Sequence, residues 1–231
     1  NLSFDNTSRP KMFTLGALPS LVSLIQFSTS SEVVANATQC LANLTLYEPT
    51  RPALVQLIPD HKEIGALRTV AVLIELCNRV ADDLVLSNAV RVLAHLCLHK
   101  ESLVKVVEER LVPLLVRICN GKPLNELEGV WKVPTAALVE STSALASLGE
   151  EGDCRPYLVQ ADAIGPLIML SQFSLTEQNR DEENAAQNAA GISLNSVTAL
   201  RNLARDDTIR MPLLKLGILR PLLLILKAET S

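Results

Sequence analysis

Apolar residues recur with helical periodicity in four segments of the chain, and each segment ends in the same short motif. Before the first motif, apolar residues at Val33, Ala37, Leu41 and Leu44 share one face of a predicted helix. The motif is LANL at residues 41–44, and it returns as LAHL at 93–96, LASL at 145–148 and LRNL at 200–203. This self-similarity predicts a repeat protein built from helices.

A second mark follows each motif and fixes the length of the repeat. With the third motif position as an anchor, the anchors are residues 1, 43, 95, 147 and 202, which are 42, 52, 52 and 55 residues apart. An arginine stands eight residues after four of the anchors, at Arg9, Arg51, Arg155 and Arg210, whereas the remaining copy has Leu103. The chain also matches itself without a gap, because NLSFDNTSRPKMFTLGAL at residues 1–18 parallels NLARDDTIRMPLLKLGIL at residues 202–219.

Each unit reads as a short first helix after the arginine, a second helix near a Gly-x-x-Pro pattern, and a third helix that carries the anchor. One unit cannot cover its own apolar face, so the units must stack. We therefore predict an all-α array over residues 1–231, with seams near 1–2, 43–51, 95–103, 147–155 and 202–210. Extra residues predict inserted loops at 57–66, 120–135 and 173–191, the last of them polar and aperiodic. Both ends fall within a repeat, which predicts a piece of a longer array.

These motifs resemble the armadillo repeat family. The resemblance rests on GALPSLVSLI at residues 16–25, the small Ala37, the LANL motif and the 42-residue first step. It implies a right-handed superhelical α-solenoid of about four repeats with three helices each. The two-helix HEAT solenoid is the neighbouring alternative, and the short first helix disfavours it.

The resemblance further implies that third helices line a groove in which an anchor Asn binds the backbone of an extended peptide. An amide suits this role because it both donates and accepts hydrogen bonds. Helical spacing places two more polar positions beside each anchor, about four and seven residues upstream. The candidate groove residues are Asn36, Gln39, Asn43, Asn88, Arg91, His95, Glu140, Ser143, Ser147, Asn195, Thr198 and Asn202.

An alternative interpretation stays open for all twelve residues, because a solenoid also needs solvated and structural polar positions. The Trp–Asn pairs of importin-type grooves are absent, since Gln39, Arg91, Ser143 and Thr198 occupy the Trp position. The recurrent arginines are expected to bond helix-end carbonyls at the seams. Trp131 either folds back onto the solenoid or anchors a partner from its loop.

Composition narrows the function classes. Apolar residues make up 48% of the chain and aromatics 3%, and the 21 basic residues are scattered at a net charge of −4, which disfavours nucleic-acid binding. The apolar segment ILRPLLLILK is too short to span a bilayer. The five cysteines lack CxxC spacing and predict buried thiols in a reducing compartment, so we expect a cytoplasmic, intracellular protein with nuclear shuttling left open.

The sequence carries no catalytic, cofactor or metal signature, since the three histidines form no metal-ligand pattern. We therefore expect a non-catalytic scaffold that needs no cofactor and binds a protein partner, as an extended peptide or a helix, in the groove. Two alternatives remain. One is a structural subunit of a cytoskeletal or ciliary assembly that docks through its convex face and loops, and the other is a regulatory array attached to a catalytic domain outside this chain.

Overall fold

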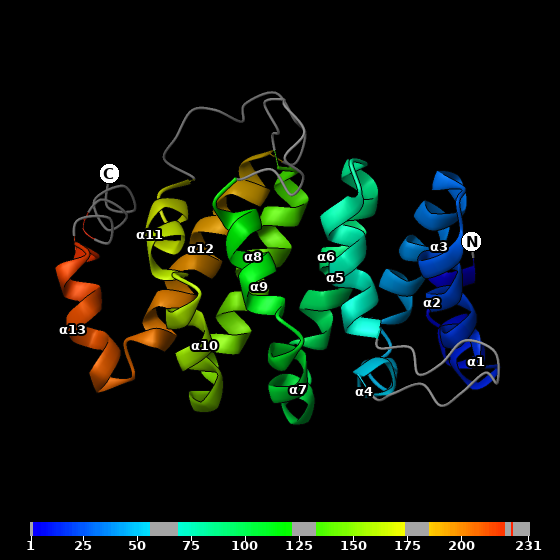
Figure 1. Cartoon of the computed structure of the whole chain (residues 1–231), viewed down its shortest axis with the longest axis horizontal. Coiled ribbons are helices and arrows are strands. Elements are labelled where there is room, and N and C mark those ends of the chain that lie inside the picture. Colours follow the sequence, from blue (N-terminus) through cyan, green and yellow to red (C-terminus); the bar gives the residue numbers. More distant parts are fainter. Residues whose placement is uncertain (1, 56–68, 122–132, 174–184, 220–222, 224–231) are drawn as a thin grey trace. The chain divides into compact units, whose positions relative to one another are not determined.

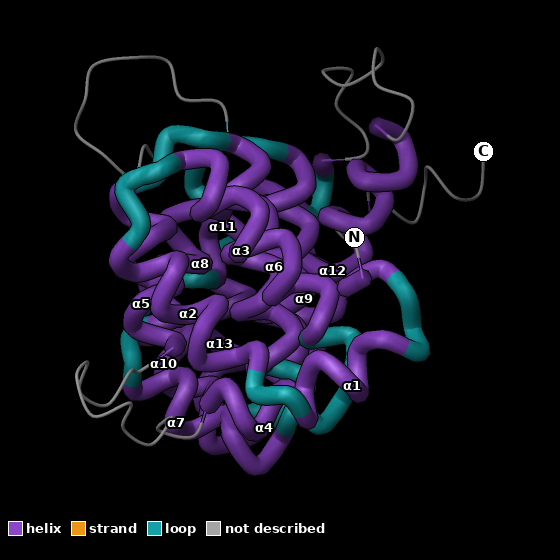
Figure 2. Tube along the Cα trace, turned by 90° about the vertical axis from the view of Figure 1, so that its right-hand side faces the viewer, coloured by secondary structure: helices purple, strands orange, loops and turns teal. Residues whose placement is uncertain are grey.

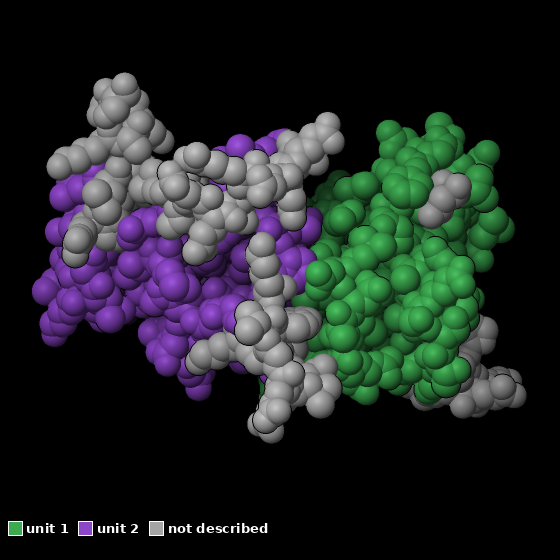
Figure 3. Space-filling model, turned by 90° about the horizontal axis from the view of Figure 1, so that it is seen from above, with its two compact units in different colours: residues 1–111, 124–126 green, residues 112–123, 127–231 purple. Residues whose placement is uncertain are grey.

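The computed structural model describes residues 2–55, 69–121, 133–173, 185–219 and 223. Within these ranges the secondary structure consists of helices joined by short loops (Figure 2). The chain divides into two compact units, drawn in two colours in Figure 3. Unit 1 comprises residues 1–111 and 124–126, and unit 2 comprises residues 112–123 and 127–231.

Unit 1 contains two complete three-helix repeats and the first helix of the next (Figure 1). Its helices are η1 (Leu2–Phe4), α1 (Ser8–Thr14), α2 (Ala17–Phe27), α3 (Ser31–Leu44), α4 (Thr50–Val55), α5 (Thr69–Arg79), α6 (Asp83–Leu96), η2 (Lys100–Ser102) and α7 (Leu103–Glu108). The third helices α3 and α6 pack against each other, and each packs against the second helix of its own repeat. The predicted order of short, second and third helix is thus confirmed in unit 1.

Unit 2 continues the same order. Its helices are α8 (Leu111–Cys119, whose first residue belongs to unit 1), α9 (Thr135–Glu150), η3 (Gly152–Cys154), α10 (Arg155–Gln160), α11 (Ile164–Leu170), α12 (Ala185–Leu203) and α13 (Asp207–Lys215). The third helices α9 and α12 pack against each other, and α11 packs against α12.

Local capping explains where several helices begin. The side chain of Ser30 accepts a hydrogen bond from Val33 N at 3.4 Å, and Asp82 accepts from Leu84 N and Val85 N at 2.9 Å. These caps satisfy amide groups that a helix start leaves without partners. Gly16 joins α1 to α2 at a φ of 74°, a left-handed conformation that glycine adopts without a steric penalty.

The recurring motif forms the core beneath the seams. Both leucines of each copy are buried, and no more than 1% of the surface is exposed for Leu41, Leu44, Leu93, Leu96, Leu145, Leu148, Leu200 and Leu203. Burying a leucine stabilises the fold by about 1.5–3 kcal/mol. The motif therefore marks the positions that hold consecutive helices together.

Two sequence predictions need correction. Val33 is 37% exposed and Val34 is buried instead, because Val33 lies in the first turn of α3, where Ser30 caps the helix. The predicted loop 173–191 is also too long, since residues 185–191 form the first turns of α12. Alanines favour the helix there, and Ala189 is buried. The predicted loop 120–135 ends where α9 begins at Thr135, and residues 57–66 lie outside the described residues.

Candidate partner-binding surface on the third helices

Third helices of consecutive repeats lie side by side within each unit, α3 with α6 and α9 with α12. Hydrogen bonds also link the two helices of each pair, from Asn88 to Gln39 in unit 1 and from Asn195 and Asn202 to main-chain carbonyls of α9 in unit 2. The polar residues predicted to line a groove therefore do share a region of each unit, and their burial differs widely.

In unit 1 the amide side chains form a directional chain of hydrogen bonds. Asn88 Nδ2 donates to Gln39 Oε1 at 3.1 Å, Gln39 Nε2 donates to Asn43 Oδ1 at 3.4 Å, and Asn43 Nδ2 donates to Ser3 Oγ at 3.0 Å. Asn43 is 4% exposed and Asn88 is fully buried, whereas Gln39 is half-buried. Asn88 Oδ1 has no hydrogen-bond partner among the described residues. The chain connects α6 to α3 and α3 to the preceding seam.

His95 occupies the anchor position of α6 and contacts the preceding seam in the same way. Its Nδ1 lies 2.6 Å from Thr45 Oγ1, which also donates to Ala42 O at 2.7 Å. Because the Thr45 hydroxyl has a single proton, this arrangement requires Nδ1 to carry a proton and leaves Nε2 as an acceptor. Burial, followed by the charges of Arg51 and Arg91, lowers the pKa of His95 to about 4. His95 is therefore neutral at pH 7.

In unit 2 the anchor amide bonds to main chain instead of a hydroxyl. Asn202 Nδ2 donates to Ala146 O at 3.0 Å, and Asn202 is 3% exposed. Seven residues upstream, Asn195 Nδ2 lies 3.3 Å from Val139 O and 3.4 Å from Thr142 Oγ1. These bonds tie α12 to α9.

The remaining candidate residues stay at the surface. Asn36 is exposed, and the half-buried members are Gln39, Arg91, His95, Glu140, Ser143, Ser147, Asn195 and Thr198. We call these residues the third-helix face of their own unit, which comprises Asn36, Gln39, Arg91 and His95 in unit 1 and Glu140, Ser143, Ser147, Asn195 and Thr198 in unit 2. Asn43, Asn88 and Asn202 are buried and use their amide N–H groups within the chain, as the structural alternative expected. Partner binding by any of the twelve residues stays a prediction.

The prediction that the recurrent arginines bond helix-end carbonyls is confirmed at the four seams, of five, that carry one. Each arginine Nε donates to the carbonyl six residues upstream, two residues after the anchor. The pairs are Arg9 with Ser3 O at 2.9 Å, Arg51 with Thr45 O at 3.1 Å, Arg155 with Gly149 O at 2.9 Å and Arg210 with Ala204 O at 3.2 Å. The arginines thus satisfy carbonyl groups that a helix end leaves without partners.

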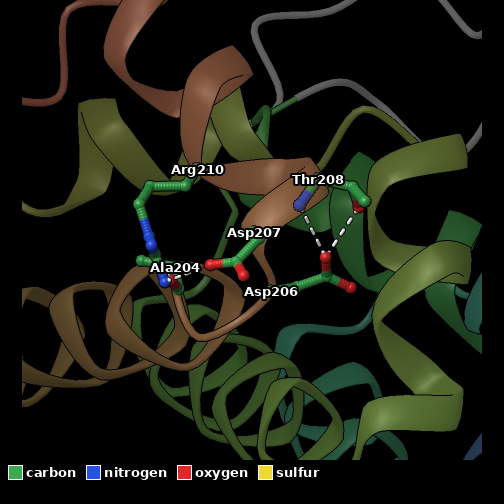
Figure 4. A network of polar contacts seen from close by, with 5 residues as sticks. All are labelled: Ala204, Asp206, Asp207, Thr208 and Arg210. Carbon is green, nitrogen blue, oxygen red and sulfur yellow. Dashed lines mark hydrogen bonds and ion pairs between the residues drawn. The ribbon is translucent and has the colours of Figure 1, made fainter.

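The last seam shows how the arginine combines with an acidic cap (Figure 4). Arg210 also forms an ion pair with Asp207 at 2.7 Å, while Asp206 Oδ1 accepts from Thr208 N at 2.9 Å and from Thr208 Oγ1 at 2.6 Å. These hydrogen bonds to Thr208 lower the pKa of Asp206. Asp5 caps the first seam similarly through Ser8 and Thr7, and these bonds lower its pKa to about 2.

The sequence predictions missed the partners of the anchors. Ser3, Thr45 and Gly149 each stand two residues after an anchor, and a Cβ built on Gly149 would lie 3.4 Å from the Asn202 Cβ. The small or hydroxyl-bearing residue at this repeated position was the signal that could have revealed the contact.

Other candidate chemistry is limited in the described part of the chain. All five cysteines are free thiols, and all but Cys40 are buried, with burial raising the pKa of Cys119 to about 12. Among the described residues no three His, Cys, Asp or Glu side chains group as a metal site, and no helix is long and apolar enough to cross a membrane. Trp131 lies outside the described residues.

Comparison with known proteins supports the repeat. Residues 8–46, which hold α1, α2 and α3, match the family model of the Armadillo/beta-catenin-like repeat. An engineered protein solved by the Northeast Structural Genomics Consortium shares 23% sequence identity and a TM-score of 0.63, with 88% of this chain and 68% of that chain covered. A second engineered protein from the consortium shares 19% identity over 96% of this chain and 66% of that chain, at a TM-score of 0.45. No curated protein matches the chain in sequence.

The family match and the likeness to the first engineered protein confirm two predictions, the resemblance to armadillo repeats and the all-α solenoid fold. The family match covers the first repeat, and the likeness to the first engineered protein supports the fold alone. Repeats of this type generally mediate protein–protein interactions.

Proposed function

We propose that this armadillo-type array is a non-catalytic, intracellular and cytoplasmic scaffold whose third-helix face binds an extended segment or a helix of a partner protein. The observation that carries the proposal is the side-by-side packing of third helices with partly exposed polar side chains at repeated positions. In unit 1, Gln39 on α3 and Arg91 on α6 hold the same repeat position, four residues before their anchors. In unit 2, Ser143 and Thr198 hold the corresponding positions on α9 and α12.

The chemistry of these positions suits recognition of a polypeptide. Gln39 and Asn195 carry amide oxygens that can accept from an N–H, and the hydroxyls of Ser143 and Thr198 can donate or accept. Ser147 donates to Ser143 O within α9, so its oxygen remains as an acceptor. Neutral His95 adds an acceptor at Nε2. Main-chain recognition thus comes from several neutral groups on adjacent helices.

Charged positions add side-chain selectivity. Arg91 on α6 favours an acidic side chain near unit 1, and Glu140 on α9 favours a basic side chain near unit 2. The two units therefore present different charges at their third-helix faces. The preferred partner carries acidic and basic side chains in separate stretches.

The test is a pull-down in which retained proteins are identified by mass spectrometry and then measured as purified segments. Arg91→Glu and Thr198→Arg are expected to weaken binding about tenfold or more, because each places an unmatched charge on the third-helix face. The matched controls are Lys105→Glu on α7 and Gln160→Arg on α10, which make the same charges at exposed positions. These controls are expected to retain the partner.

Equal retention by both sets of variants, at unchanged melting temperature, would refute binding by the third-helix face. Alanine substitutions of Asn43 and Asn202 are less suitable tests. Both side chains are buried and hydrogen-bonded within the chain, so their loss would alter folding as well as binding.

A further inference from the structure

Three large apolar side chains are exposed at equivalent positions of successive seams in unit 1. Phe4, Leu46 and Leu98 each stand three residues after an anchor, and they are 61%, 49% and 49% exposed. We call these three residues the seam ridge. The same position in unit 2 holds Glu150 and Arg205, which are both exposed. A single exposed leucine is ordinary, whereas these three apolar side chains recur at one position with the period of the array.

Local hydrogen bonds establish that these positions are structurally equivalent. Leu46 N donates to Asn43 O and Leu98 N donates to His95 O, both at 3.2 Å. Arg205 N repeats this bond with Asn202 O at 3.3 Å. At the other two seams, an arginine Nη2 donates to the carbonyl of the residue at this position. Arg9 donates to Phe4 O at 3.2 Å, and Arg155 donates to Glu150 O at 3.0 Å.

The ridge positions succeed one another at a spacing of one repeat. Asn43 bonds to Ser3, the neighbour of Phe4, and His95 contacts Thr45, the neighbour of Leu46. Each seam therefore abuts the next through the residue beside the ridge. Because packed helices lie about 8–10 Å apart, the ridge side chains are spaced by roughly 10 Å.

We propose that unit 1 docks an amphipathic helix of a partner protein along the seam ridge. A helix rises about 1.5 Å per residue, so apolar residues seven apart lie about 10.5 Å apart on nearly the same face. A helix with apolar residues at i, i+7 and i+14 therefore matches all three ridge positions. An extended strand covers about 10 Å in three residues, which turns the next side chain to the opposite face.

The size of the ridge favours a short helix over a second copy of this chain. Three partly exposed side chains offer on the order of 300 Å² of apolar surface, whereas a stable dimer buries about 800 Å² per partner. Unit 2 cannot extend the ridge, because Glu150 and Arg205 replace its apolar residues. The expected ligand is one helix of about four turns.

The test uses two displayed peptide libraries selected against the full chain. One fixes Leu at i, i+7 and i+14 in a helix-forming background with randomised flanks. The other fixes Leu at i, i+3 and i+6 in a proline-rich background, because a polyproline II helix also repeats about every 9.3 Å. We expect binders from the helical library, weakened about tenfold or more by Leu46→Glu and by Leu98→Glu. Leu24→Glu and Met169→Glu, at other exposed apolar positions, are expected to bind normally.

The proposal is overturned if the helical library yields no binder, or if its binders are insensitive to the ridge substitutions. Ridge-dependent binders from the proline-rich library alone would also overturn it, in favour of a polyproline segment. Arg91→Glu separates this surface from the third-helix face, because it is expected to leave the selected helix bound. If the seam ridge binds no helix, the proposed function of the third-helix face is therefore unaffected.

Discussion

In both units third helices of consecutive repeats pack side by side, but the anchor residues make different contacts with the preceding repeat. In unit 1, Asn43 and His95 each reach a hydroxyl two residues after the preceding anchor, on Ser3 and Thr45. In unit 2 that position is Gly149, and Asn202 donates to the Ala146 carbonyl instead. A Cβ added at Gly149 would already lie in contact with α12, 3.4 Å from the Asn202 Cβ and 3.5 Å from Ala199 O, so a larger side chain would press on that helix. The anchors Asn43, His95 and Asn202 thus meet different groups of the preceding repeat, whereas the anchor Ser147 donates to Ser143 O within α9.

Some contacts thus recur unchanged from repeat to repeat, whereas the contacts of the anchor residues vary. The buried leucines and the arginine-to-carbonyl bonds recur in both units, because they serve the helix ends themselves. The anchors vary with the side chain they meet. Three of the four anchors on the third helices therefore form contacts between repeats.

The largest expected effect comes from filling the space at Gly149. Gly149→Val is expected to lower the free energy of unfolding by about 3 kcal/mol, because its side chain would press on Asn202 and Ala199. Denaturant unfolding measures the change. Gly165→Val is the matched control, since Gly165 is also helical and a Cβ there meets nothing within 4 Å. Equal effects at both glycines would show that the close approach of α9 and α12 is unimportant.

Removal of each seam arginine is expected to reduce stability by an amount that depends on how many carbonyl groups it binds. Arg155 donates to two carbonyl groups, Gly149 O and Glu150 O, so Arg155→Met is expected to destabilise the protein by about 2 kcal/mol. Arg210 has a side chain that is 53% exposed and donates to one carbonyl, so Arg210→Met is expected to cost about 0.5 kcal/mol. Thermal unfolding of both variants measures the ranking, and a larger loss at Arg210 would reverse it.

Acid should destabilise unit 1 at His95, because protonation places a charge on a partly buried ring near Arg51 and Arg91. The folded protein holds the pKa of His95 near 4, below the ordinary 6.5, so the unfolded chain binds a proton first as the pH falls. The free energy of unfolding then decreases between pH 6.5 and pH 4, by about 1 kcal/mol after allowance for solvent screening. His95→Gln removes this contribution. An identical pH dependence of unfolding in wild type and variant would contradict the conclusion that His95 causes the loss of stability in acid.

The smallest effect concerns the hydroxyl partner of Asn43. A double-mutant cycle of Ser3→Ala and Asn43→Ala is expected to give a coupling free energy of about 0.5 kcal/mol. The matched cycle of Gly149→Ser with Asn202→Ala should give no favourable coupling, because Asn202 binds main chain. Urea unfolding of the single and double variants supplies both values, and similar couplings would remove the distinction between the units.

Much of this architecture could be predicted from the sequence because it rests on local periodicity. The three-helix order followed from apolar spacing, and the role of Arg51 and Arg155 followed from their fixed distance after the anchors. The burial of Asn43, Asn88 and Asn202 could not be predicted, since it depends on how closely the preceding repeat packs. The start of α12 was missed because the polar insertion before it hides a stretch of good helix formers, Ala185 to Ala190.

Site-specific photo-crosslinking tests most directly whether the third-helix face binds a partner. A photoreactive amino acid at Gln39 on α3 is compared with the same amino acid at Glu75, an exposed position on the second helix α5. We predict that a partner captured by the full chain crosslinks from position 39 and not from position 75. Crosslinking from position 75 alone would contradict binding at the third-helix face and place the partner on the second helices.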